Sequence, residues 1–125
     1  MPRAHRYEVG EHSNFILVPM LIAALKQLLK WTPLGIQEYC EELCHDAIDS
    51  LRSDGYTIEA SKGRASHLFG IYFNENTTME RIERALSKFR VKISIRDQAL
   101  RVSPNVYNDQ KDIQRLLSAL KEAVI

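Results

Sequence analysis

Hydrophobic positions recur at helical spacing in the first half of the chain and predict two consecutive helices. The first is expected over about 17–31. Its own apolar residues occupy so much of its circumference that we expect it to be buried on most sides. The second is expected over about 33–53. Thr32 would cap it, Pro33 would take the first helical position, and Gly55 would end it.

Alternation of apolar and polar residues in the second half predicts strands. Residues 56–60 alternate weakly, as in a short edge strand, and residues 67–73 are almost continuously apolar or aromatic, as in a central strand. Residues 91–96 and 100–103 each place apolar side chains on one side and polar ones, Arg96 and Arg101 among them, on the other, with a turn at 97–98 between them. These last two segments predict an antiparallel hairpin with one apolar face.

Two further helices flank this hairpin. Thr77 and Glu80 fit a capping box at the start of one, and Asn108 or Asp109 caps the other. The resulting order of elements predicts an α+β fold, with a small antiparallel or mixed sheet of about three strands, covered on one face by helices and preceded by a long N-terminal helix. No repeat or linker interrupts the pattern, so residues 1–125 are expected to form a single domain.

Composition and charge exclude several classes of function. Seventeen Lys and Arg against sixteen Asp and Glu give a formal net charge of +1, so a nucleic-acid partner is not expected. The longest apolar run, Phe15 to Leu25, has 11 residues, which is too short for a bilayer that requires about 20. The first residues lack the apolar centre and cleavage site of a secretory signal. We therefore expect a cytoplasmic protein without a membrane partner.

The chain lacks the common motifs of catalysis. It has no glycine-rich phosphate loop, no His-Glu-x-x-His helix and no paired Cys-x-x-Cys. Cys40 and Cys44 lie four residues apart in a helical pattern, with poor geometry for a disulfide, and we interpret both as reduced thiols of the core or its boundary. His45 points to a different helix face from its neighbour Cys44, so no metal site is expected. His67 fits a structural histidine or a base.

The second arm of the hairpin carries the candidate binding residue. If Leu100 and Val102 face the helices, Arg101 and Ser103 leave the sheet together on its opposite face. An arginine there presents a planar, permanently charged fork that suits a carboxylate. A solvated arginine on the exposed side of a strand fits the same spacing, which leaves both interpretations open.

The hairpin and the segment after it resemble the C-terminal end of a known enzyme family. Residues 101–108 read RVSPNVYN and lead into a closing helix, as in class-V aminotransferase-family proteins. These are fold-type-I pyridoxal-phosphate enzymes, and they include cysteine desulfurases, selenocysteine lyases and isopenicillin N epimerase-like proteins. Residues 6–25 are similar to the segment that leaves the family's large domain, and residues 64–71 to its first small-domain strand. The resemblance covers nearly the whole chain but only the last third of a complete enzyme.

This resemblance implies an enzyme domain without its cofactor centre. In the family, the large domain supplies the lysine that binds pyridoxal phosphate and most phosphate contacts, so the large cofactor-binding domain would be absent from this chain. Arg101 would bind the α-carboxylate of an amino-acid substrate, and Ser13 and Asn14 would approach the cofactor phosphate of a neighbouring subunit. Glu11 departs from the small hydroxyl residue common in that turn. The segment 97–99 lacks the nucleophilic cysteine of long-loop desulfurases, which favours a lyase, an epimerase or an aminotransferase.

Two functions remain open from the sequence. The first is the C-terminal domain of such an enzyme, with no catalytic residue of its own, inactive alone and without bound cofactor. The second is a stand-alone α+β module that binds a ligand or partner without catalysis. The apolar residues 15–25 exceed what a small core covers, so we expect the chain to form homo-oligomers or to associate with a large domain through them.

Overall fold

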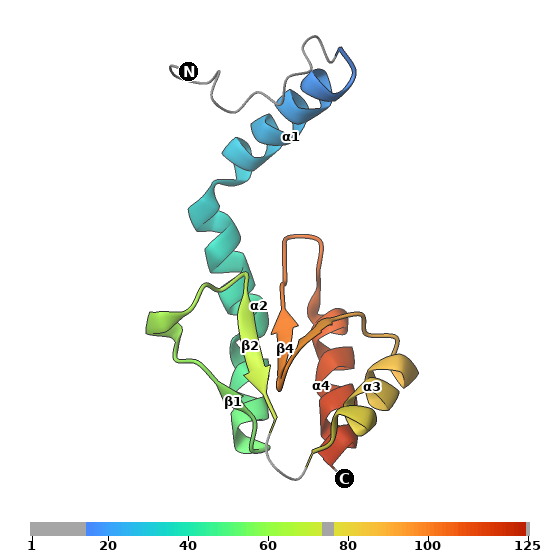
Figure 1. The fold of residues 1–125 in the computed structure, drawn as a ribbon. Coiled ribbons are helices and arrows are strands. Elements are labelled where there is room, and N and C mark those ends of the chain that lie inside the picture. Colours follow the sequence, from blue (N-terminus) through green and yellow to red (C-terminus); the bar gives the residue numbers. More distant parts are fainter. Residues whose placement is uncertain (1–14, 74–76, 125) are drawn as a thin grey trace. The chain divides into compact units, whose positions relative to one another are not determined.

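The computed structural model describes residues 15–73 and 77–124 (Figure 1). The chain divides into two compact units, Met1–Pro33 and Leu34–Ile125. The first contains helix α1 (Leu17–Trp31), and helix α2 (Pro33–Ser53) begins where the units meet. The second unit also contains two further helices and four strands: β1 (Thr57–Ile58), β2 (Phe69–Tyr72), α3 (Met79–Lys88), β3 (Ser94–Arg96), β4 (Ala99–Val102) and α4 (Gln110–Val124).

Helix α1 has the predicted bounds but not the predicted burial. None of its residues is buried, and Leu21 and Leu29 are 57% and 75% exposed. The expectation that it is buried on most sides was therefore wrong. Among the described residues of its unit, no other complete helix or strand is present to cover its apolar sides. Within the described part of the chain, no helix is long and apolar enough to cross a membrane.

Helix α2 begins and ends at the predicted residues. Pro33 takes the first helical position, where its missing N–H costs no hydrogen bond. Gly55 ends the helix with a φ of 91°, a left-handed conformation that costs glycine little. There the N–H of Gly55 donates to the carbonyl of Arg52 (3.1 Å), and the N–H of Tyr56 donates to that of Leu51 (3.0 Å).

The four strands form one antiparallel sheet in the order β1-β2-β4-β3. The near-continuous apolar segment became β2, which lies between β1 and β4 and confirms the expectation of a central strand. The sheet has four strands instead of about three because the weakly alternating segment also pairs, through Thr57 and Ile58. The hairpin is shorter than predicted. Its pairing begins at Ser94, and Val91 and Ile93 pack against the core before the strand starts.

Helix α3 is capped one residue later than the sequence predicted. Thr78 is the N-cap, and its hydroxyl oxygen accepts a hydrogen bond from the backbone N–H of Arg81 (3.4 Å). Thr77 is buried, with 7% of its surface exposed, whereas Thr78 is exposed and caps the helix. The capping box of Thr77 and Glu80 was therefore displaced by one position.

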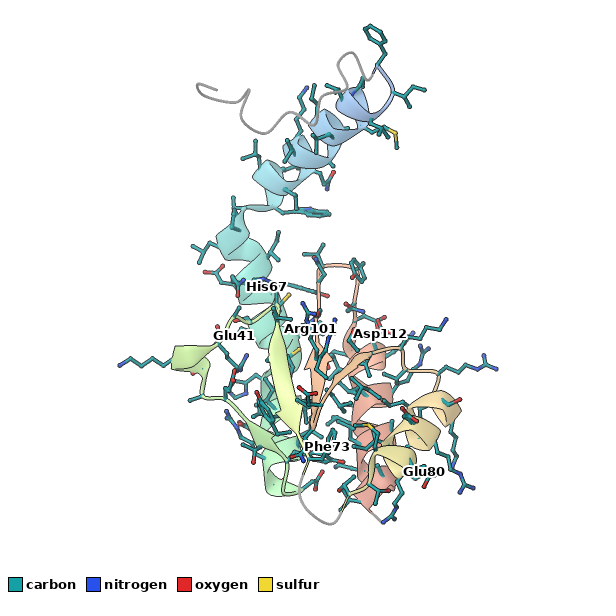
Figure 2. All side chains as sticks on the ribbon, in the orientation of Figure 1. Glu41, His67, Phe73, Glu80, Arg101 and Asp112 are labelled. Carbon is teal, nitrogen blue, oxygen red and sulfur yellow. The ribbon has the colours of Figure 1, made fainter. Side chains whose placement is uncertain are left out.

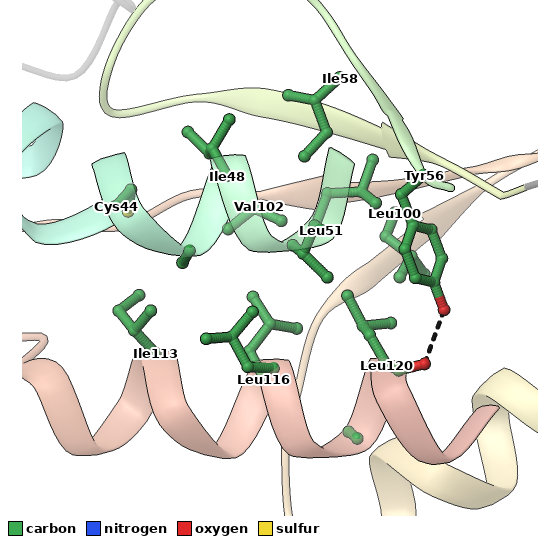
Figure 3. Packing of buried hydrophobic residues seen from close by; sticks show 14 of the residues in the cluster. Cys44, Ile48, Leu51, Tyr56, Ile58, Leu100, Val102, Ile113, Leu116 and Leu120 are labelled. Carbon is green, nitrogen blue, oxygen red and sulfur yellow. Dashed lines mark hydrogen bonds between the residues drawn. The ribbon is translucent and has the colours of Figure 1, made fainter. Parts of the chain in front are cut away.

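The core lies between the sheet and helices α2, α3 and α4, and Figure 3 shows its packing. Buried side chains alternate with exposed ones along β4, and Leu100 is completely buried. The hydroxyl of Tyr56 donates a hydrogen bond of 2.7 Å to the carbonyl of Leu120, which ties the end of α2 to α4. Cys40 and Cys44 are both free and buried, as predicted. The fold is thus α+β, with a helix-covered face and an open face of the sheet.

Candidate functional site

Arg101 leaves the sheet on its open face, as the alternation predicted (Figure 2). Its neighbours Leu100 and Val102 are 0% and 6% exposed, whereas Arg101 itself is exposed. We define the open face as the exposed or half-buried positions of β2, β3 and β4 that alternate with the core residues of these strands. It consists of Gly70, Tyr72, Ser94, Arg96, Ala99 and Arg101.

The register of the strands fixes which residues surround Arg101. Gly70 of β2 lies opposite Arg101 on one side, and Ser94 of β3 lies opposite on the other. Arg96 pairs with Ala99, two residues along β4 on the same face. Arg96 is therefore a diagonal neighbour of Arg101. Residues in this relation are typically about 7–8 Å apart, with their Cβ atoms somewhat closer, so long side chains can reach a common ligand.

Gly70 has no side chain on this face, and the ring of Tyr72 extends over it. A Cβ placed on Gly70 would lie only 3.2 Å from Cε2 of Tyr72 and 3.5 Å from its Oη. The phenol ring therefore extends along the open face toward the residue that pairs with Arg101. A larger residue at position 70 would push the ring away.

Five residues of the open face line a shallow depression of about 420 Å³ in the second unit: Gly70, Tyr72, Arg96, Ala99 and Arg101. The loop between β1 and β2 contributes its other side, including Glu59 and Arg64. Among the residues that the structure describes, no hydrogen bond or ion pair engages the side chains of Arg96, Arg101 or Tyr72. The depression thus offers two unpaired guanidinium groups and a phenol to a ligand.

A second depression of about 290 Å³ lies on the other side of Arg101, between the segment before β3 and the start of α4. Its carboxylate, Asp112, forms an ion pair with Arg115 at 3.5 Å. Asp112 Oδ2 also accepts a hydrogen bond from Asn108 Nδ2 (3.1 Å), and this hydrogen bond lowers the pKa of Asp112 below its ordinary value. Asp112 is therefore engaged by the protein itself. Three other charged side chains that line this depression have no hydrogen bond or ion pair among the described residues: Arg90, Lys92 and Arg101.

The loop after β4 is fixed by its own side chains. Asn108 Oδ1 accepts a hydrogen bond from the N–H of Asn105 (3.0 Å), and the Tyr39 hydroxyl donates to the carbonyl of Asn108 (2.7 Å). Asp109 caps α4 by accepting from the N–H groups of Lys111 and Asp112, which decides between the two predicted caps. Most of the segment that carries the family resemblance thus anchors the end of the strand that holds Arg101.

The other predicted sites lie elsewhere. Ser13 and Asn14, the expected cofactor-phosphate contacts, fall outside the described residues, as does Glu11. His67 is hydrogen-bonded to the side chain of Gln37, which favours the structural interpretation over a base. In the described part of the chain, no group of three or more His, Cys, Asp or Glu could hold a metal ion.

The chain's lysines do not fit covalent attachment of pyridoxal phosphate. A Schiff-base lysine needs a desolvated pocket or a neighbouring cation that lowers its pKa. All seven lysines are exposed instead. Lys88 forms an ion pair of 2.6 Å with Glu122, and Lys121 lies 3.8 Å from Asp54. The described residues thus provide no site at which this chain could anchor the cofactor.

The comparisons with known proteins leave the family open. No family model matches the chain, and no curated protein is detectably related to it. The assignment of a function therefore rests on the open face and on the residues that carry the resemblance.

The predicted hairpin placed Arg96 on the same polar face as Arg101, although Arg96 was not named as a site residue. Sequence reasoning missed the neighbours Gly70 and Tyr72. The position of Gly70 and Tyr72 beside Arg101 depends on which strand lies next to β4. Nothing in the local pattern specifies that pairing, so no sequence signal was available for these two residues.

Proposed function

We propose that this chain is the C-terminal domain of a class-V aminotransferase-like, pyridoxal-phosphate-dependent enzyme, and that Arg101 binds the α-carboxylate of the amino-acid substrate. The observation that carries the proposal is the position of Arg101, exposed and without a protein partner among the described residues, at the edge of a depression. A guanidinium fork binds a carboxylate through two parallel hydrogen bonds. The resemblance of residues 101–108 and of the helix after them supports the same role.

In this proposal the chain positions the substrate and closes over the cofactor, while a large domain holds the cofactor. Pyridoxal phosphate supplies the electron sink for chemistry at the substrate's α-carbon. Because all the lysines of this chain are exposed, the covalent contact belongs to the large domain. The chain alone would neither bind the cofactor nor turn over substrate. The parent enzyme would be a cytoplasmic lyase, epimerase or aminotransferase.

The apolar surface of α1 supports an assembly larger than this chain. Its exposed apolar residues are contiguous along the helix, and soluble monomers seldom expose more than a few hundred Å² of such surface. We propose that a large domain covers this surface in the enzyme and that a second copy covers it in the isolated chain. Light scattering on the purified chain is expected to show dimers or larger species. A monomer at high concentration would contradict this part of the proposal.

The kinetic test uses the enzyme that contains this chain. Arg101→Ala is expected to raise KM for the amino-acid substrate at least about tenfold, the factor for losing one charge-assisted contact of about 1.4 kcal/mol. Arg101→Lys should restore little, because an ammonium lacks the planar fork. Arg84→Ala, an exposed arginine of α3 without a described partner, is the matched control. An unchanged KM in Arg101→Ala would refute the carboxylate role.

A second candidate function is a stand-alone module that binds a small anion. It is favoured by one observation, that the depression on the open face is lined by residues of the second unit alone. The two functions predict different molecules bound to the chain in its native cell. Native purification would recover the chain with pyridoxal phosphate in the first case and without it in the second.

A further inference from the structure

We propose that the depression on the open face binds a ligand with two anionic groups, one on Arg101 and the second on Arg96. If the proposed function holds, on which the identity of the first group rests, the substrate is an acidic amino acid and Arg96 binds its side-chain carboxylate. Arg96 would then determine substrate specificity. The inference is carried by three features of the second unit, which are the register of two strands, the small residues between them and the charge of the lining.

The register places the two arginines close enough for one small molecule to bridge them. Arg96 and Arg101 lie on adjacent strands and on the same face, with one residue pair of the ladder between them. Diagonal neighbours of this kind lie about 7–8 Å apart, with their Cβ atoms somewhat closer. Two flexible side chains that start at this separation can each take one carboxylate of a four- or five-carbon dicarboxylate.

The residues around the two arginines leave space for the body of a ligand. Ala99, opposite Arg96, has only a methyl group, whereas the space over Gly70, beside Arg101, is occupied by the ring of Tyr72. Tyr72 closes the side next to Ala99, with its ring leaning toward Gly70. The hollow of about 420 Å³ is lined by Gly70 and Ala99 and by the larger side chains of Leu68 and Tyr72. Arg96 and Arg101 belong to the same lining.

The charges of the lining suit a dianion. Arg64, Arg96 and Arg101 contribute three positive charges, and Glu59 contributes one negative charge. Neither Arg96 nor Arg101 has an ion-pair partner among the described residues. The two carboxylates of an acidic amino acid would pair with Arg96 and Arg101, and its α-ammonium group would leave part of the positive excess uncompensated. An amino acid with an uncharged side chain would leave Arg96 unpaired.

Edge protection is the competing explanation for Arg96. β3 is an edge strand, and an exposed charge on such a strand discourages pairing with another chain. That role requires a charge on β3 but no ligand in the depression. It predicts that Arg96 is indifferent to the second charge of an amino acid, so a binding experiment separates the two explanations.

The test compares L-glutamate with L-glutamine, which have the same size and differ in one carboxylate. Binding to the full chain is followed by the ¹⁵N NMR signals of the arginine Nε–H groups at matched ionic strength. We expect both ligands to shift Arg101 and only glutamate to shift Arg96. Glutamate should bind about fivefold more tightly, the factor for one exposed ion pair of about 1 kcal/mol.

Three variants assign the effect to residues. Arg96→Gln should abolish the preference for glutamate and keep the binding of glutamine. Arg101→Gln should weaken the binding of both ligands. Arg84→Gln on α3 is the control and should leave both affinities and their ratio unchanged. Because all three side chains are exposed, the amide spectra should show intact folds in each variant.

The possible failures distinguish this inference from the proposed function. Equal affinities for the two ligands, with Arg101 still shifted, would overturn the role of Arg96 and leave the carboxylate role of Arg101 intact. A glutamate preference that persists in Arg96→Gln would also overturn it. If neither ligand shifts Arg101 more than Arg84, the depression is no carboxylate site and both proposals fail.

Discussion

Arg101 and Leu100 are adjacent in the chain but lie on opposite faces of β4, so truncating each to alanine measures what each face contributes to stability. Leu100 is completely buried in the core, where removal of a leucine side chain typically costs 2–5 kcal/mol, the range covering how far the cavity collapses. Arg101 is exposed, without a described partner, and surface changes of this kind stay within about 0.5 kcal/mol. We therefore expect Leu100→Ala to cost at least about 2 kcal/mol and Arg101→Ala almost nothing.

Urea unfolding followed by circular dichroism gives both values, and equal slopes in the variants show that the same unfolding is compared. Protein concentration is kept low and constant so that association through α1 does not contribute. A loss of several kcal/mol in Arg101→Ala would show that the arginine is a structural partner, and the reasoning from strand faces would be refuted. A small loss in Leu100→Ala would refute the assignment of the core.

Three further predictions concern the interior and the loop after β4. Tyr56→Phe removes the buried hydrogen bond to the carbonyl of Leu120 and should lower the free energy of unfolding by about 1 kcal/mol in urea titrations; no change would mean that the bond contributes nothing. The pKa of Asp112 is lowered in the folded chain, so its stabilising effect is present above the unfolded pKa and is lost as the pH falls through the folded one. Asp112→Asn should thus destabilise the chain at neutral pH and not in strong acid, and a pH-independent difference would contradict this. Burial raises the pKa of Cys44 to about 11, so its alkylation at pH 8 should be slow until urea unfolds the chain, and rapid labelling of the native protein would refute its burial.

The sequence predicted elements better than it predicted what covers them. Periodicity identified α1 and α2 with their bounds, because the spacing of apolar residues within a single segment is enough to reveal a helix. The burial of α1 could not be predicted in the same way, since it depends on which other surfaces are present. The cap of α3 was displaced because Thr77 and Thr78 can both cap a helix, and the core decides between them by burying Thr77.

The candidate site was likewise predictable only where it depends on a local pattern. Alternation within one strand was enough to place Arg101 on the open face. Its neighbour Arg96 belongs to the predicted hairpin, whereas Gly70 comes from β2, and its position follows from the order β1-β2-β4-β3 and its register. Pairing between strands distant in sequence is set by the packing of the whole core, so the hollow between the two arginines was not predictable from either strand alone.

The central claim is that this chain works as the substrate-binding domain of a pyridoxal-phosphate enzyme, and the cofactor content of the native species tests it most directly. An antibody against the second unit would isolate that species from its source under non-denaturing conditions, and pyridoxal phosphate released from it would be quantified. The account predicts stoichiometric pyridoxal phosphate, either in a longer polypeptide that includes this chain or in a complex with a separate large domain. A native species of 14.4 kDa subunits without pyridoxal phosphate would contradict it.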